Sequence, residues 1–142
     1  MRVAALLVAV ATLAACASSS TSTSTSSAPA TAVPITEIKM VAGKWAGNVR
    51  GLAGPRDDAG DWVQMTIAES GAYEFSIART IGVFSGKGMF SVKDGKLAME
   101  GERGSGTFTL FERDGRRFLR GGGTIGSGSG TPLSGELRPA TR

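Results

Sequence analysis

The sequence predicts an all-β domain: an antiparallel, up-and-down meander of about eight short strands that closes as a small β-barrel. A two-sheet sandwich is the alternative. Runs of alternating polar and apolar residues fill the chain after residue 36, glycine-rich turns separate them, and almost none has the spacing of an amphipathic helix. Closure into a barrel also removes the exposed strand edges that invite aggregation.

The first strands follow a short turn. Residues 35–41 allow one helical turn, and residues 43–50 are the first strand candidate. Residues 62–68 alternate, and after a turn at residues 69–71 so do residues 73–77, with the odd-numbered apolar residues of each segment on one face. This period of two predicts strands that each bury one face.

Two copies of one hairpin pattern come next, over residues 86–100 and 104–120. Each copy has G-x-G-x-F-[ST]-[VL], then Asp-Gly and a basic residue, then a second apolar strand. The dipeptides Asp94-Gly95 and Asp114-Gly115 are typical of type I′ turns, in which both central residues have positive φ. The pattern predicts two consecutive hairpins, and therefore a four-stranded meander.

The end of the domain contains a glycine–serine segment and one more strand. Residues 121–130 predict a mobile loop, because they are almost entirely glycine, serine and threonine. Residues 131–138 then predict the closing strand, with Pro132 at its start, where a missing backbone donor matters least.

The first 15 residues have the pattern of a secretory signal peptide. A positive start precedes an apolar run over residues 3–13, which as a helix spans about 16 Å, half of a bilayer core. Residues 13–16, L-A-A-C, resemble the bacterial lipobox. The resemblance implies cleavage before Cys16 and attachment of acyl chains such as palmitate to Cys16. An ordinary signal peptide with an unpaired cysteine is the alternative.

A lipoprotein of this kind is anchored in a membrane by its acyl chains, without a transmembrane helix. Ala17 stands where aspartate commonly retains Gram-negative lipoproteins in the inner membrane, so the resemblance favours the outer membrane, on either face. Residues 17–34 contain eleven Ser/Thr and no charge, which predicts a disordered tether. The expected organisation is therefore a signal peptide over residues 1–15, a lipidated linker over 16–35 and a β-barrel-like domain over 36–142.

The tripeptide Gly-Lys-Trp at residues 43–45 resembles the G-x-W motif that opens the first strand of calycins, the lipocalin and avidin group of small barrels. The resemblance implies that Trp45 closes one barrel end, that a late arginine, Arg120 or Arg138, packs on it, and that the opposite mouth admits a small apolar ligand. Core packing is the alternative role for the aromatic residues, because short eight-stranded barrels fill their interior with side chains. The candidate ligand-binding or barrel-interior residues are Trp45, Trp62, Tyr73 and Phe75.

Composition excludes several classes of function. The chain has no histidine and one cysteine, which excludes histidine-based triads, histidine-ligated or cysteine-cluster metal sites and an intrachain disulfide. The acidic loop at residues 57–61 lacks EF-hand spacing, and the pair Glu100 and Glu102 is expected on an exposed strand face rather than in a cleft. We therefore expect a protein that is not an enzyme and uses no cofactor.

The basic residues gather toward the end of the chain, which carries 16 Lys and Arg against 12 Asp and Glu. Arg113, Arg116, Arg117 and Arg120 flank one hairpin turn and form a candidate anion-binding group for the phosphates of envelope lipids. Solubility and protection of strand edges are the alternative role. Nucleic acid is not an expected partner of a lipid-anchored envelope protein.

Two hypotheses of function remain. The first is a tethered barrel that binds a small apolar or amphiphilic ligand or an envelope lipid. The second is a structural or interaction lipoprotein with a filled core, whose surface docks or inhibits another envelope or secreted protein. The volume of the barrel interior distinguishes them.

Overall fold

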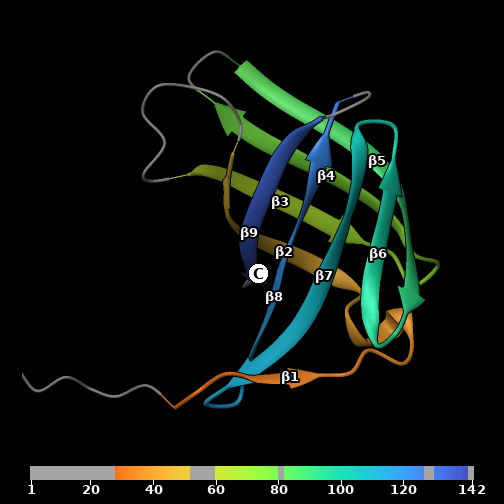
Figure 1. Cartoon of the computed structure of the whole chain (residues 1–142), viewed down its shortest axis with the longest axis vertical. Helices are drawn as coiled ribbons and strands as arrows, with labels where there is room; N and C mark the ends of the chain where they lie inside the picture. The colour runs from red at the N-terminus through yellow and green to blue at the C-terminus, as the bar shows by residue number, and fades with distance from the viewer. Residues whose placement is uncertain (1–27, 52–59, 80–81, 127–129, 141–142) are drawn as a thin grey trace, which may run out of the picture.

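A nine-stranded antiparallel sheet makes up the fold, and eight of its strands close into a barrel (Figure 1). The strands are β1 (Thr31–Val33), β2 (Gly43–Arg50), β3 (Asp61–Ile67), β4 (Ala72–Arg79), β5 (Gly82–Lys93), β6 (Lys96–Gly101), β7 (Gly104–Arg113), β8 (Arg116–Ile125) and β9 (Thr131–Pro139). One 3-10 turn, η1 (Ile38–Met40), precedes β2.

The computed structural model describes residues 28–51, 60–79, 82–126 and 130–140. The predicted signal peptide, Cys16 and most of the predicted linker lie outside these ranges. Within them, no residue belongs to a helix with the length and apolar character that a membrane span needs.

The barrel has the predicted up-and-down order. Each strand from β2 to β8 pairs antiparallel with the next one along the chain. The ring closes where β9 pairs with β2, from Trp45 opposite Pro139 to Arg50 opposite Ser134. One sheet therefore runs around the whole circuit, which confirms the barrel and excludes the two-sheet sandwich.

Both Asp-Gly turns have the predicted geometry. Asp94 and Gly95 have φ of 52° and 72°, and Asp114 and Gly115 have φ of 52° and 70°. Asp94 and Asp114 are the only non-glycine residues with positive φ among those described. The positive angles at both central positions of each turn match a type I′ hairpin. The β5–β6 and β7–β8 hairpins are thus confirmed.

Alternation along the strands places one apolar face inside the barrel. In β3, for example, Val63, Met65 and Ile67 are buried while Gln64 and Thr66 between them are exposed. The buried core consists of Ile35, Val41, Trp45, Val63, Met65, Ile67, Tyr73, Ile77, Phe90, Leu97, Leu110, Leu119 and Leu137.

Glycine at inward positions makes room for aromatic rings. A β-carbon on Gly86 would lie 2.7 Å from the Phe75 ring, and one on Gly88 would lie 2.7 Å from the Tyr73 hydroxyl. A β-carbon on Gly101 would overlap the same hydroxyl. The glycine-rich strands therefore complement the aromatic strand β4, and the interior packs large side chains against bare backbone.

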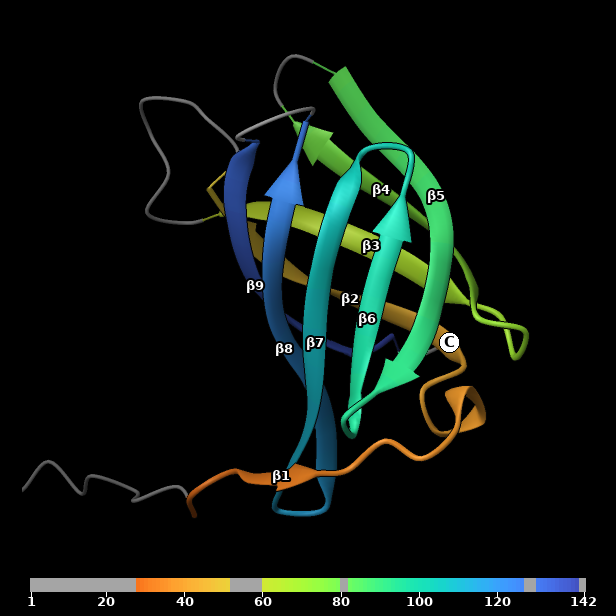
Figure 2. The ribbon, with the colours of Figure 1, turned by 45° about the vertical axis from the view of Figure 1, so that its right-hand side comes forward.

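The ordered domain begins before residue 36. Thr31–Val33, within the predicted linker, forms β1 and pairs with Leu110–Glu112 of β7. Ile35 is 1% exposed, and its N–H donates to the Gly95 carbonyl oxygen. The last residues of the predicted linker, after its Ser/Thr-rich part, thus belong to the folded domain, and Ile35 among them is apolar and buried. In Figure 2, β1 crosses the lower end of the barrel beside the tip of the β7–β8 hairpin.

The prediction of a mobile loop over residues 121–130 is wrong for its first half. Gly121–Ile125 belongs to β8 and pairs with β7 on one side and β9 on the other. A β-carbon on Gly123 would overlap the Ser105 carbonyl oxygen. Glycine is needed here because neighbouring backbones approach closely, which composition alone does not distinguish from flexibility.

Candidate functional site

The barrel interior contains one small apolar cavity of about 60 Å³ within the described residues, lined by side chains such as Val49, Phe75, Met99, Phe108 and Ile125. An engineered apolar cavity of about 150 Å³ admits benzene, and ligand pockets usually have volumes of about 300–1,000 Å³. Among the described residues, side chains therefore fill most of the interior, and this cavity is too small for a lipid or a drug-sized ligand.

Trp45 lies inside the barrel and is 4% exposed. Its indole Nε1–H donates to the Val41 carbonyl oxygen over 2.7 Å, which satisfies the one polar atom of the ring. The expectation that Arg120 or Arg138 packs on Trp45 is wrong. Both arginines are on the outer face. Arg138 is opposite Ala46, whose side chain points away from the interior that Trp45 occupies, and Arg120 is opposite Glu136 on the same outer face.

Of the other aromatic candidates, Tyr73 and Phe75 line the interior and Trp62 does not. Tyr73 is 3% exposed, with its ring centroid 4.7 Å from that of Phe90, and burial raises the pKa of its hydroxyl. Trp62 is 50% exposed. It shares the outer face with Gln64 because it alternates with the buried Val63, so its placement in the barrel interior is corrected.

On the outer face, four side chains from four adjacent strands stand in one row. Trp62 of β3 is opposite Asn48 of β2, Asn48 is opposite Glu136 of β9, and Glu136 is opposite Arg120 of β8. Strand spacing of about 4.8 Å separates Trp62 from Arg120 by about 14 Å across the barrel wall. Strand register thus brings together residues that are up to 88 positions apart in sequence.

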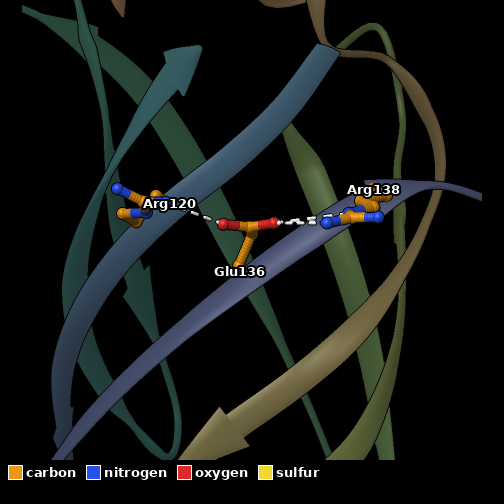
Figure 3. A network of polar contacts seen from close by, with 3 residues as sticks. All are labelled: Arg120, Glu136 and Arg138. Carbon is orange, nitrogen blue, oxygen red and sulfur yellow. Dashed lines mark hydrogen bonds and ion pairs between the residues drawn. The ribbon is translucent and has the colours of Figure 1, made fainter. Parts of the chain in front are cut away.

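Glu136 lies between two arginines in this face (Figure 3). One of its carboxylate oxygens accepts from Arg120 Nη2 over 2.9 Å, and the other accepts from Arg138 Nη2 over 3.1 Å. Partial burial acts to raise the pKa of the Glu136 carboxyl, but hydrogen bonds and charge from both arginines outweigh it and lower that pKa. The network holds the two guanidinium groups in place and leaves a net positive charge.

These residues line a hollow on the barrel surface, which we call the outer groove. It has a volume of about 860 Å³ and runs over the outside of β3, β2, β9 and β8. Its floor includes small residues such as Ala46, Gly47 and Gly135. Its larger or polar lining residues are Asn48, Arg50, Trp62, Gln64, Arg120, Ser134, Glu136 and Arg138.

A second hollow, which we call the arginine pocket, lies at the tip of the β7–β8 hairpin. It has a volume of about 390 Å³, and its lining residues are Arg113, Asp114, Arg116, Arg117, Phe118 and Arg138. Four of these six side chains are cationic and one is anionic. This arrangement concentrates positive charge in a concave surface and is suited to binding an anion.

An aromatic pair supports the arginines of the hairpin. The rings of Phe111 and Phe118 stack with centroids 5.4 Å apart, at an angle of 13°. The guanidinium carbon of Arg120 lies 5.4 Å from both ring centroids, and that of Arg113 lies 5.6 Å from the Phe118 centroid. Cation–π contacts of this kind orient the arginines. Arg120 also donates to Glu136, and Arg117 forms an ion pair of 3.7 Å with Glu112.

The structure therefore divides the predicted arginine group. Arg113, Arg116 and Arg117 line the arginine pocket, whereas Arg120 lines the outer groove. Arg138 lines both hollows and was absent from the predicted group. Only the strand register shows that Arg138 lies near this hairpin, because continuing the β8–β9 pairing by one residue places Arg138 opposite Phe118.

The carboxylates form no comparable centre. Glu100 is exposed on β6, and Glu102 makes an ion pair of 3.8 Å with Lys87. Asp61, from the predicted acidic loop, pairs with Arg79 at 3.3 Å, and most of that loop lies outside the described residues. No group of three metal-ligating side chains occurs in the part of the chain that the structure describes.

Comparison with protein families, with curated proteins and with solved structures finds no match to this chain.

Proposed function

We propose that this protein is a lipid-anchored binding protein of the cell envelope. Its arginine pocket lies at the membrane surface and binds the phosphates of anionic lipids. In this proposal Cys16 carries the acyl chains, the barrel is a rigid scaffold, and the ligand binds outside the barrel. The protein needs no cofactor and catalyses no reaction in this role.

The observation that carries the proposal is the place where the linker meets the barrel. Thr31 of β1 is opposite Glu112 of β7, directly before the arginine hairpin. The described chain begins at residue 28 and therefore enters the domain beside the arginine pocket. A flexible linker with the length of residues 16–30 would reach about 21 Å. A lipid at Cys16 would keep the pocket close to the headgroups.

The volumes of the hollows support a ligand on the outside. The interior cavity of about 60 Å³ is too small for an acyl chain, whereas the arginine pocket of about 390 Å³ is open to solvent and lined by four arginines. Each basic residue near an anionic membrane surface contributes about 1 kcal/mol to binding. The second hypothesis, docking of another protein, is also compatible with a filled core. It names no partner whose charge complements the arginines as the phosphates of anionic lipids do.

The anchor is tested by cell fractionation. We expect Cys16→Ser to move the protein from the membrane fraction to the soluble fraction, because the variant cannot be acylated. If the variant still sediments fully with outer membranes, the anchor is wrong.

The arginine pocket is tested separately with a chain that starts at residue 28, which contains every core residue and lacks Cys16. Binding is measured by flotation with phosphatidylcholine vesicles that contain or lack phosphatidylglycerol. We expect Arg113→Gln with Arg116→Gln to weaken binding to the anionic vesicles roughly 30-fold, since two contacts of about 1 kcal/mol are lost.

The β5–β6 hairpin supplies a matched control. Lys93 and Lys96 flank Asp94-Gly95 just as Arg113 and Arg116 flank Asp114-Gly115. Lys93→Gln with Lys96→Gln removes the same charge from an equivalent hairpin and is expected to leave most of the binding intact. Equal losses in the two double variants would mean that net charge alone attracts the protein, and would overturn the proposed site.

A further inference from the structure

We infer that the outer groove is a second binding site, for an acidic saccharide that stacks on Trp62 and places a carboxylate against Arg120 and Arg138. This inference goes beyond the proposed function, because it concerns a different hollow and a different class of ligand. The evidence for it is the row of side chains that strand pairing places across β3, β2, β9 and β8, namely Trp62, Asn48, Glu136 and Arg120.

Among the described residues, Trp62 has no aromatic or cationic partner for its ring. It is 50% exposed. Its neighbours in register are the short side chains of Asn48 and Ala78. A tryptophan in this position can stack against the apolar face of a pyranose ring, whose C–H groups are attracted to the π system.

The rest of the groove is polar. Asn48 and Gln64 have planar amides that donate and accept, and Glu136 accepts from the two arginines that flank it. Ring hydroxyls are both donors and acceptors, so planar side chains of these kinds recognise them in pairs of hydrogen bonds. Among the described lining residues Trp62 is the one large apolar side chain, so an acyl chain would find no continuous apolar surface on them.

Charge selects an acidic saccharide over a neutral one. Three arginines, Arg50, Arg120 and Arg138, line the groove against the single carboxylate of Glu136. The carboxylate fixes two of the guanidinium groups, and each keeps further N–H donors for a ligand. Trp62 and Arg120 stand three strand spacings apart, about 14 Å along the barrel wall, so a ligand that contacts both must be longer than a single sugar ring.

A peptide fits the groove less well. Each of the four strands beneath it pairs with a neighbour on both sides, so no backbone edge is free there to add a peptide strand. Recognition must come from side chains alone, and only one of them offers a large apolar contact. The lining therefore favours a ligand that is polar throughout except for its ring faces.

The experiment uses the full chain in a neutral detergent, with tetragalacturonate as the acidic probe and its fully methyl-esterified form as the neutral control. Trp45 is buried, so a change in tryptophan fluorescence on binding reports on Trp62, the second of the two tryptophans. We expect saturable binding of the acid, weakened about tenfold or more by esterification, because charge-assisted hydrogen bonds are lost.

Calorimetry with variants locates the site. Arg120→Gln is expected to weaken binding about tenfold, and Trp62→Ala at least about fivefold. Met89→Ala, which removes a side chain of matching exposure outside the groove, and Arg116→Gln, at the hairpin tip, are expected to have no effect. The Arg116→Gln control separates this site from the proposed lipid site, so that either can fail alone.

Each of the following results would overturn the inference. The first is the absence of saturable binding, and the second is equal affinity for the acid and its methyl ester. The third is binding that survives Trp62→Ala or is displaced equally well by a poly-glutamate peptide, which would show that the groove responds to negative charge alone.

Discussion

The hydroxyl of Tyr73 occupies the place, on the inside of the barrel, that a β-carbon on Gly101 would take. Tyr73 reaches this point from β4, and β6 accommodates the ring because it has glycine there. The contact shows how the interior is filled: a large ring from one strand occupies the space that glycine leaves on another.

Gly101→Ala should destabilise the barrel by about 1–3 kcal/mol, because the new methyl group overpacks a filled interior. Urea unfolding measures the change, and a double-mutant cycle with Tyr73→Phe tests its cause. The cost should fall when the hydroxyl is absent. Gly115→Ala is the control: nothing lies within 4 Å of its added β-carbon, so its cost, from φ of +70°, should not depend on Tyr73.

Ionisation of Tyr73 should limit stability at alkaline pH. Burial raises its pKa above the ordinary value of 10.0, so the native state resists losing the proton. The stability linked to this group is complete below pH 10.0 and is lost as pH rises through the native pKa. Tyr73 is the single tyrosine, so near-ultraviolet absorbance follows it directly. A native midpoint at or below the midpoint measured in denaturant would contradict the burial described here.

Glu136→Gln should lower stability at neutral pH by about 1 kcal/mol, the usual scale for exposed ion pairs. The native pKa of Glu136 is lowered below 4.5, so its stabilisation is present above that value and is lost as pH falls through the native pKa. Thermal unfolding across acid and neutral pH should therefore show the two proteins converge in acid. Glu102→Gln, which breaks a more exposed pair of 3.8 Å with Lys87, should change stability little. A difference for Glu136→Gln that is the same at every pH would refute the ion-pair explanation.

Ile35→Ala should destabilise the domain by about 2–5 kcal/mol, the usual cost of truncating a fully buried isoleucine. Ile35 is 1% exposed, although it lies at the end of the Ser/Thr-rich segment. Chemical denaturation measures the effect, with the exposed Thr36→Ala beside it as the control. Equal stability of Ile35→Ala and the parent chain would mean that the domain begins later than the structure shows.

Local patterns predicted most of the fold. Alternation located β2, β3, β4 and β9 almost to the residue, and Asp-Gly located both hairpin turns, because strand period and turn chemistry are properties of neighbouring residues. The glycines of β8 were misassigned to a loop. Whether glycine gives a flexible loop or a close approach of two backbones depends on the partner strand, which the local sequence does not contain.

The candidate site was less accessible from the sequence. A cluster of arginines within eight positions marked one hairpin, and three of them do line one pocket. Arg138 and Trp62 join Arg120 in the outer groove only through the pairings of β8, β9, β2 and β3. Extended to Trp62, the alternation in residues 62–68 indicates the outer face that the structure shows for it. Its assignment to the interior followed the usual tendency of large aromatic residues to be buried.

The most direct test of ligand binding outside a filled barrel is an NMR titration of the chain from residue 28 with short-chain phosphatidylglycerol. We predict that amide signals of the β7–β8 hairpin, from Glu112 to Arg117, and of Arg138 shift saturably, while the methyl signals of Val49, Ile125 and Leu133 around the interior cavity stay in place. Shifts of those interior methyl groups with an unchanged hairpin would show that the ligand enters the barrel, and would contradict the account.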